Sequence, residues 1–198
     1  MLALAACGCG SSAPAGNSAA AASPYAGLPP DVRPRPVGPG RAYRPAAVSA
    51  AVSRRATIDG LGCRAAPGRR FGVHLELFAH RFVVHVPAGI GVAPPQRTSG
   101  AYVLGGACYY ALRTLEPTGV VQVAPGRPLT LGVLFAVWGQ RLAERALLSF
   151  RGPVLGFVDG RRWHGPLTEI GLHRHAEIVL EIDGELPPHP AYDFAPGL

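Results

Sequence analysis

The 198-residue chain contains 26 glycines and 21 prolines, and its 19 basic residues against 12 acidic ones give a formal net charge of +7. All of the basic residues are arginines, scattered over the terminal segment, turns and strand ends without a basic helix. This distribution argues against nucleic-acid binding and instead favours contact with anionic lipid headgroups. The length predicts one domain plus a disordered tail rather than two domains.

The first seven residues, MLALAAC, form a short apolar run that ends at Cys7. Small and apolar residues directly before a cysteine match a bacterial lipobox, in which the cysteine thiol is acylated after signal cleavage. A complete signal peptide has a basic leader and a longer apolar stretch, so we expect the signal to start upstream of Met1. An ordinary alanine-rich terminus is the alternative.

Residues 9–44 are rich first in glycine, serine and alanine and then in proline, as in PPDVRPRPVGPGR. Such a segment cannot bury enough apolar surface to order itself, and its proline-rich half favours an extended polyproline II chain. We therefore predict that residues 1–45 form a signal remnant and a disordered tether, lipidated at Cys7. Residues 46–198 are predicted to form a single β-rich domain, displayed outside the cytoplasm on the cell membrane.

Cys63 and Cys108 are the two cysteines of the predicted domain. Residues 57–63, TIDGLGC, predict a short strand and an Asp-Gly turn that ends at Cys63. Outside the cytoplasm an even pair of cysteines is most simply a disulfide, which would stabilise the fold by roughly 3 to 5 kcal/mol in the chain-entropy treatment. Metal ligation or catalysis by the pair is the lesser alternative, because neither cysteine has a CxxC spacing.

Residues 71–86, FGVHLELFAHRFVVHV, predict two strands joined by a turn near residues 79–81. Alternation in the first strand places Val73 and Leu75 on one face and His74 and Glu76 on the other, the pattern of a half-buried strand. Residues 92–100 are predicted to be loop. Residues 107–112 and 120–123 predict a further hairpin.

Residues 129–139, LTLGVLFAVWG, contain the best helix candidate of the domain. Apolar side chains recur at helical spacing, Thr130 is a plausible N-cap, and Gly139 is a C-terminal stop. We expect a short helix over residues 131–138, with Phe135 and Trp138 packed against the sheet.

The last part of the chain predicts a hairpin, a long strand and a tail. Asp159-Gly160 between apolar runs is the strongest local hairpin signal of the sequence. Residues 173–182, HRHAEIVLEI, alternate cleanly and predict a final strand with His173, His175 and Glu177 on its second face. Residues 187–198 are expected to form an extended proline-rich tail. The fold class is therefore predicted as α+β, a mostly antiparallel β-sheet with one short helix.

The domain resembles a family of uncharacterised, mostly actinobacterial lipoproteins and secreted proteins. The resemblance runs from about residue 58 to the C-terminus. It rests on several short matches in the same order: IDGLGC, HLELF with VPAGIG, CYYALRT, TLGVLFAVWG, FVDG, LHRHAEIVLEI and FAPGL.

The resemblance implies a histidine site that this chain has largely lost. Family members typically carry an H-x-H-x-H run before the first strand pair and an L-H-T-H-D-x-x-G-x-x-H stretch after the second cysteine, a pattern that suggests metal binding. The first run falls on Arg70, Gly72 and His74, so only His74 keeps an imidazole. All three histidines of the second stretch, which covers Leu112, Arg113, Thr114, Leu115, Glu116, Gly119 and Gln122, are replaced.

The histidines that remain leave two readings open. His74 with Glu76 and Glu116 can form a remnant metal site, or His74 can be an ordinary strand histidine beside solvated carboxylates. His173 and His175 can bind a divalent ion together with Glu177, or can simply face solvent.

No nucleophile elbow, P-loop, zinc-protease motif or dinucleotide-binding glycine pattern occurs in the sequence, and we expect no catalytic activity. Two hypotheses remain. The first is a non-catalytic cell-envelope lipoprotein that binds an unknown envelope component and needs no cofactor. The second is an envelope lipoprotein that binds copper or zinc through His74, His173 and His175.

Overall fold

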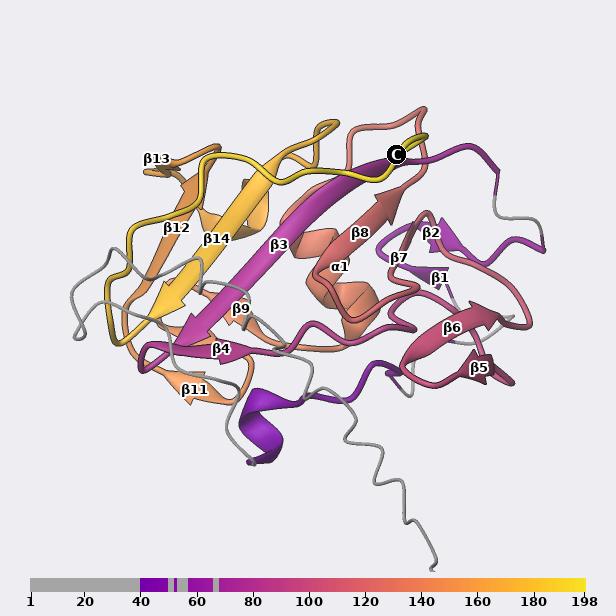
Figure 1. Cartoon of the computed structure of the whole chain (residues 1–198), viewed down its shortest axis with the longest axis horizontal. Helices are drawn as coiled ribbons and strands as arrows, with labels where there is room; N and C mark the ends of the chain where they lie inside the picture. Colours follow the sequence, from indigo (N-terminus) through magenta and orange to yellow (C-terminus); the bar gives the residue numbers. More distant parts are fainter. Residues whose placement is uncertain (1–39, 50–51, 53–56, 66–67) are drawn as a thin grey trace, which may run out of the picture.

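The computed structural model describes residues 40–49, 52, 57–65 and 68–198. Its centre is a seven-stranded sheet in the order β13-β12-β14-β3-β8-β7, with β4 also paired to β3 (Figure 1). The predicted lipidation site Cys7 and most of the predicted tether lie outside the described residues. The strands of this sheet are β3 (Phe71–Ala79), β4 (Phe82–Val84), β7 (Leu112–Arg113), β8 (Val120–Val123), β12 (Val154–Val158), β13 (Arg161–Arg162) and β14 (Glu177–Ile182).

The prediction of a mostly antiparallel sheet is confirmed, with one parallel pairing that the alternation pattern did not reveal. β3 pairs antiparallel with β4 and β8, whereas β14 lies parallel to β3. The last strand therefore enters the middle of the sheet, between β12 and β3. A parallel neighbour needs a long crossover, and here the chain between β3 and β14 supplies most of the domain.

The helix α1 (Leu131–Trp138) has the predicted bounds and lies against one face of the sheet (Figure 1). Phe135 and Trp138 are fully buried in the main core, together with the face of β3 that carries Val73 and Leu75. Gly139 ends the helix in the left-handed conformation, as expected of a C-terminal glycine. Thr130 is in the N-cap position but its side chain makes no capping hydrogen bond.

Three small sheets surround the main one. They consist of β1 (Thr57–Ile58) with β2 (Leu61–Gly62), of β5 (Arg97–Ser99) with β6 (Tyr102–Gly105), and of β9 (Leu142–Ala143), β10 (Ala146–Leu147) and β11 (Phe150–Arg151). The β5 strand corrects the prediction of a loop over residues 92–100, because its polar sequence gives no alternation signal. The predicted strand over residues 107–112 is also shorter, since only Leu112 of that range belongs to β7.

Local turn chemistry was predicted correctly. Asp159 and Gly160 both have positive φ, 51° and 75°, and join β12 to β13. Two residues with positive φ form the tight turn whose twist matches an antiparallel hairpin. Cys63 and Cys108 form the expected disulfide, with their Cα atoms 5.6 Å apart.

The C-terminal segment, residues 186–198, is extended as predicted but lies across the second face of the sheet (Figure 1). Leu186 packs with Phe78, Phe157 and Val179 in a second apolar cluster on this face. As a result every residue of β14 is buried, including Glu177 and Glu181, which the alternation pattern had placed on a second, polar face.

Two 3-10 helices, Arg41–Tyr43 and Leu167–Glu169, complete the described elements. None of the described helices has the length and apolar character needed to cross a bilayer.

Candidate metal centre

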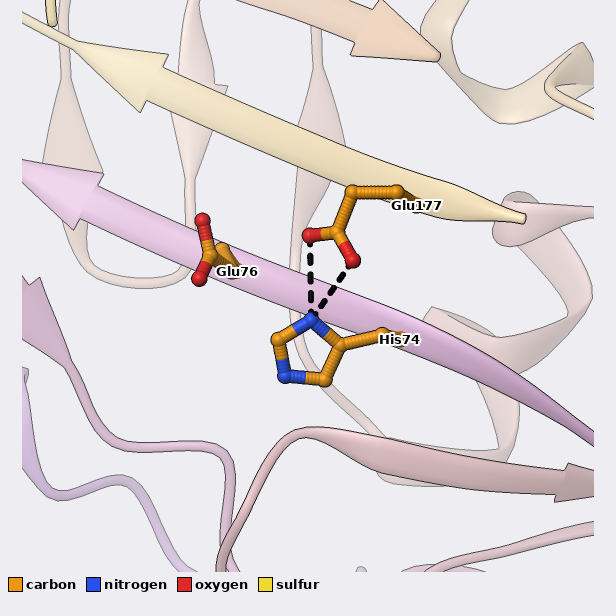
Figure 2. Close-up of side chains that lie close together, drawn as sticks. All are labelled: His74, Glu76 and Glu177. Carbon is orange, nitrogen blue, oxygen red and sulfur yellow. Dashed lines mark hydrogen bonds and ion pairs between the residues drawn. The ribbon is translucent and has the colours of Figure 1, made fainter. Parts of the chain in front are cut away.

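Three ligand-bearing side chains converge where β3 and β14 lie side by side. The parallel register places Glu177 next to His74, and Glu76 follows His74 on the same face of β3 because side chains two residues apart in a strand point the same way. One ligand atom of each residue lies within 4.8 Å of the others (Figure 2). We call His74, Glu76 and Glu177 the His74 group.

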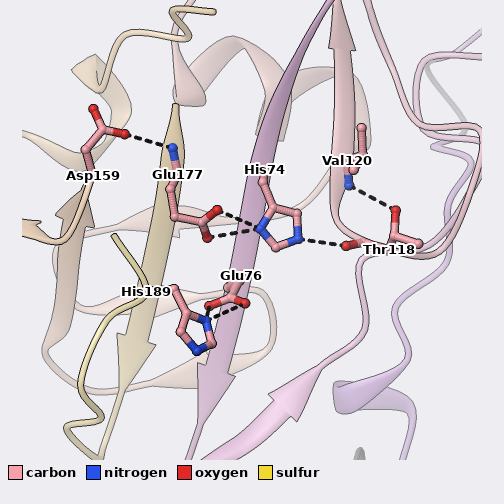
Figure 3. Close-up of polar contacts among 7 residues, drawn as sticks. All are labelled: His74, Glu76, Thr118, Val120, Asp159, Glu177 and His189. Atoms are coloured by element: carbon pink, nitrogen blue, oxygen red, sulfur yellow. Dashed lines mark hydrogen bonds and ion pairs between the residues drawn. The ribbon is translucent and has the colours of Figure 1, made fainter. Parts of the chain in front are cut away.

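His74 has an acceptor at each ring nitrogen. Its Nδ1 lies 3.0 and 2.8 Å from the two carboxylate oxygens of Glu177, and its Nε2 lies 2.8 Å from the backbone oxygen of Thr118 (Figure 3). His74 is 6% exposed and Glu177 is 1% exposed. A carbonyl oxygen can only accept, so Nε2 carries the proton and Nδ1 faces the carboxylate.

This arrangement leaves one position between Nδ1 and Glu177 that needs a positive charge. A neutral ring with its proton on Nε2 has a lone pair on Nδ1, which would repel an ionised carboxylate. The contact is favourable if His74 is an imidazolium, if Glu177 holds a proton, or if a cation lies between the two groups. The geometry is therefore that of a proton site or a metal site.

The pKa shifts of the pair reflect these alternatives. Burial alone would lower the pKa of His74, but the hydrogen bonds and charge of Glu177 outweigh it and hold that pKa above its ordinary value. Burial raises the pKa of Glu177, and the contact with His74 offsets this only in part. We take the imidazolium–carboxylate pair as the resting state, because the short contacts favour the charged form of both partners.

Gly119 lets the loop before β8 approach His74 closely. Its φ is 84°, and a Cβ atom at this position would lie 2.5 Å from the backbone oxygen of Leu75 and 3.0 Å from His74 Nε2. Any larger residue would push the Thr118 carbonyl away from the ring. A metal-ligating histidine typically donates its second N–H to such a carbonyl, which fixes the ring and its tautomer.

The C-terminal segment adds two side chains to the His74 group. His189 Nδ1 lies 2.9 Å from a carboxylate oxygen of Glu76 (Figure 3), and the Tyr192 ring stacks on the His74 ring with centroids 3.8 Å apart. The segment thus runs antiparallel to β3 over its face. Beside the group lies a cavity of about 280 Å³, lined in part by His74, Glu76, His85 and Thr118.

The other predicted site residues lie elsewhere. His173 is exposed and its Nε2 lies 3.1 Å from Asp159 Oδ2, and His175 is exposed with its Nε2 2.6 Å from the Leu198 backbone oxygen. Both precede β14 rather than lying in it, which corrects the predicted start of that strand. In the described part of the chain, the group of converging ligand atoms contains His74 but neither His173, His175 nor Glu116.

Three of the positions at which the resemblance led us to expect histidines, Gly72, Arg113 and Gln122, lie on the neighbouring strands β3, β7 and β8. Gly72 pairs with Gln122 across β3 and β8, and Arg113 pairs with Gln122 across β7 and β8. Arg113 Nε donates a hydrogen bond to Gln122 Oε1 at 2.9 Å. A permanently charged guanidinium cannot ligate a cation, and among the residues that the structure describes the converging ligand atoms are those of the His74 group.

Sequence reasoning paired His74 with Glu76 and noted Glu177, but it did not find His189 or Tyr192. Both lie in a proline-rich tail without periodicity, and no local signal shows which strand such a tail covers.

Comparisons of the chain with protein-family models, with curated proteins and with solved structures found no match.

Proposed function

We propose that this chain is an extracytoplasmic, lipid-anchored binding module whose domain takes up a divalent transition-metal ion, zinc or copper, at the His74 group. The observation that carries the proposal is that Nδ1 of His74 points at the Glu177 carboxylate while Nε2 is bonded to a carbonyl. With an ion in place of the proton on Nδ1, this is the tautomer and the outer hydrogen bond typical of a metal-ligating imidazole.

The donor set fits such an ion. Zinc is bound by histidine nitrogen and carboxylate oxygen at about 2 Å, so that ligand atoms sharing one ion lie about 3 Å apart. The separations between His74 and Glu177 are 2.8 and 3.0 Å. His189, bonded to Glu76, can serve as a further ligand or orient that carboxylate. Imidazole with carboxylate suits zinc and copper better than calcium, which prefers oxygen alone.

The placement outside the cytoplasm is supported by two independent features. The lipobox-like run ending at Cys7 provides the anchor. The Cys63–Cys108 disulfide is of the kind that persists in oxidising compartments. Mass spectrometry of membrane fractions for diacylglycerol on Cys7 tests the anchor, and an unacylated chain in the cytosol would contradict it.

A second candidate function is a non-catalytic module that binds an unknown envelope component and no metal. The observation in its favour is that His74 and Glu177 form a short, buried ion pair that is satisfied without an added ion. The two candidates differ in what lies between these side chains. It is a metal ion in the first candidate and a proton in the second.

Metal content decides between them. The full chain is loaded with excess zinc or copper, dialysed, and measured by inductively coupled plasma mass spectrometry. We expect a stoichiometric ion, lost in His74→Ala and kept in His173→Ala, a matched control because His173 is an exposed histidine paired with an aspartate outside the group.

His189→Ala provides a milder variant, because His189 is partly exposed. Loss of a carboxylate's hydrogen-bond partner typically lowers metal affinity about 10- to 100-fold. Circular dichroism confirms that each variant is folded. A folded wild-type chain that retains no ion after loading would reject metal binding and leave the second candidate.

A further inference from the structure

A second cavity, of about 560 Å³, lies at the other end of the molecule from β4 and is larger than the one beside the His74 group. Its walls come from the β1–β2 hairpin, the chain that leads into β3, the segment after Cys108 and the loop that follows β8. We call it the arginine cavity. Its lining includes the four arginines Arg64, Arg69, Arg70 and Arg127 and the apolar or aromatic residues Leu61, Tyr109, Tyr110 and Leu129.

The charges of the arginine cavity have one sign. No aspartate or glutamate lines it, and within the described residues none of its four arginines lies within ion-pairing distance of a carboxylate. Arg127 bonds to the Asp59 residue of the hairpin turn, but through the backbone oxygen at 3.2 Å. The four arginines therefore line one cavity, and none of them has a carboxylate partner among the described residues.

Arg70 is the most enclosed of the four. Its Nη1 donates a 2.7 Å hydrogen bond to the Ala111 backbone oxygen, whereas its Nε is buried without a hydrogen-bond partner. Burial, together with the positive charge of Arg113, lowers the pKa of Arg70 to about 10. A buried charged donor without a partner is costly, so this guanidinium lies where negative charge is most favourable.

The cavity wall is held in place before any ligand arrives. The disulfide joins Cys63 to Cys108, and the residues that follow them, Arg64 and Tyr109, exchange backbone hydrogen bonds of 2.9 and 2.8 Å. Arg113 lies over the Tyr109 ring, 5.0 Å from its centroid. Groups fixed in this way lose little conformational freedom on binding, which favours affinity.

We propose that the arginine cavity binds an organic phosphate, an anion with a body about the size of a sugar ring. Guanidinium groups match the oxygens of a phosphate in paired, charge-assisted hydrogen bonds. Several cations are better compensated by a multiply charged phosphate than by a single carboxylate. The volume lies within the range of small-molecule sites, and the aromatic and leucine walls provide the surface that a ring packs against.

The same phosphate chemistry occurs in soluble sugar phosphates and in lipid headgroups. The inference does not depend on the proposed metal site. It is tested by isothermal titration of the oxidised full chain with glucose 1-phosphate, with glucose as the uncharged control. In parallel, vesicles of phosphatidylcholine with and without phosphatidylglycerol are sedimented with the protein.

Arg64→Gln and Arg127→Gln remove one cavity charge each from exposed positions. Arg161→Gln is the matched control, since Arg161 is an exposed arginine in β13 and does not line the cavity. Loss of one charge-assisted hydrogen bond is expected to weaken binding about tenfold or more. The control should bind as the wild type does.

Binding of glucose 1-phosphate that is weakened by the two cavity variants supports the site with a soluble ligand. Binding only to phosphatidylglycerol vesicles, weakened by the same two variants and not by Arg161→Gln, supports the site with a headgroup ligand. Absence of both kinds of binding overturns the proposal. An equal loss in Arg161→Gln overturns it as well, because the attraction would then be that of the net charge.

Discussion

The His74 group and the arginine cavity place charge near the same strand in opposite ways. Arg70 directly precedes β3, and His74 lies four residues further along it. In the His74 group the charges are buried, paired with each other and covered by the C-terminal segment. In the arginine cavity they face an open space and have no carboxylate partner among the described residues.

The two regions differ in how much their charged side chains contribute to the stability of the ligand-free protein. A buried ion pair is stable only as a pair, because removal of either partner leaves an uncompensated charge in the interior. Exposed arginines that contact no carboxylate can be changed with little effect on stability. Substitutions in the His74 group should therefore alter both ion binding and stability. Substitutions of the exposed arginines of the cavity should alter ligand binding alone.

Removal of the disulfide should have a large effect on stability, and it should act first on the arginine cavity. The bond closes a loop with a sequence separation of 45 residues. In the chain-entropy treatment, Cys63→Ser with Cys108→Ser should lower the free energy of unfolding by about 4 kcal/mol. Urea denaturation measures the loss.

Hydrogen exchange then locates the change. The amides of Arg64 and Tyr109, which bond across the disulfide, should gain the most exchange, and the amide of His74, bonded to Ala176 in the sheet, the least. Equal unfolding free energies for the oxidised protein and the serine variant would show that the bond does not hold this wall.

Removal of one charge from each region should show the difference between them most directly. Glu177→Gln should lower the free energy of unfolding by about 3 to 5 kcal/mol, because it leaves His74 without its buried partner. Arg127→Gln should change it by less than about 0.5 kcal/mol. Both values come from urea denaturation without added ligand.

The double variant His74→Gln with Glu177→Gln serves as the control for Glu177. It removes both charges of the buried pair and should recover part of the stability lost in Glu177→Gln. If the two single changes, at Glu177 and at Arg127, cost the same free energy, the distinction between a paired and an unpaired region fails.

We predict that stability depends on pH through Glu181, which lies in β14 on the face of the sheet that the C-terminal segment covers. It is fully buried, the Leu186 N–H donates to its Oε2, and its Oε1 has no hydrogen-bond partner. Burial, with a smaller contribution from Glu185, raises the pKa of Glu181 from 4.5 to about 7. The folded state then holds a proton that the unfolded state releases, so this stability is full below about pH 4.5 and is lost as the pH rises through about 7.

Glu181→Gln replaces the protonated acid by an amide of the same shape. It should be close to the wild type near pH 4 and be more stable by about 3 kcal/mol near pH 8.5. Thermal or urea denaturation at the two pH values gives the difference. A gap that does not widen with pH would mean that Glu181 is ionised in the folded protein.

Tyr192→Ala should have a small effect on stability and should open the His74 group. A stacked aromatic pair contributes about 0.5 to 1.5 kcal/mol, and Tyr192 is only partly buried. Reaction of His74 with a histidine-acylating reagent, followed by mass spectrometry, should become faster. Tyr102→Ala, at a tyrosine that is 53% exposed in β6, should leave the rate unchanged, and an equal rate in both variants would mean that the segment does not cover the ring.

Features determined by neighbouring residues could be predicted from the sequence. The helix was found with its bounds because its apolar spacing ends at Gly139, and the β12–β13 hairpin because Asp159-Gly160 suits a tight turn. The disulfide followed from a single pair of cysteines in the domain. Each of these depends on one short stretch or on one residue type.

Features determined by distant segments could not be predicted from the sequence. Alternation places His74 and Glu76 on one face, but it is the same for parallel and antiparallel neighbours, so it did not bring Glu177 beside His74. His189 reaches Glu76 from 113 residues away. The arginine cavity is built from turns and loops, which carry no periodic signal.

The position of β14 has a consequence for how the polypeptide is made. It is the last strand of the described residues to be synthesised, yet it separates β12 from β3. Until Ile182 has been synthesised, these two strands have no shared neighbour and leave hydrogen-bonding edges exposed, which favours self-association. A nascent or proteolytically shortened chain that stops before Glu177 should therefore fail to close its sheet, so that the native state becomes available only after β14 has been made.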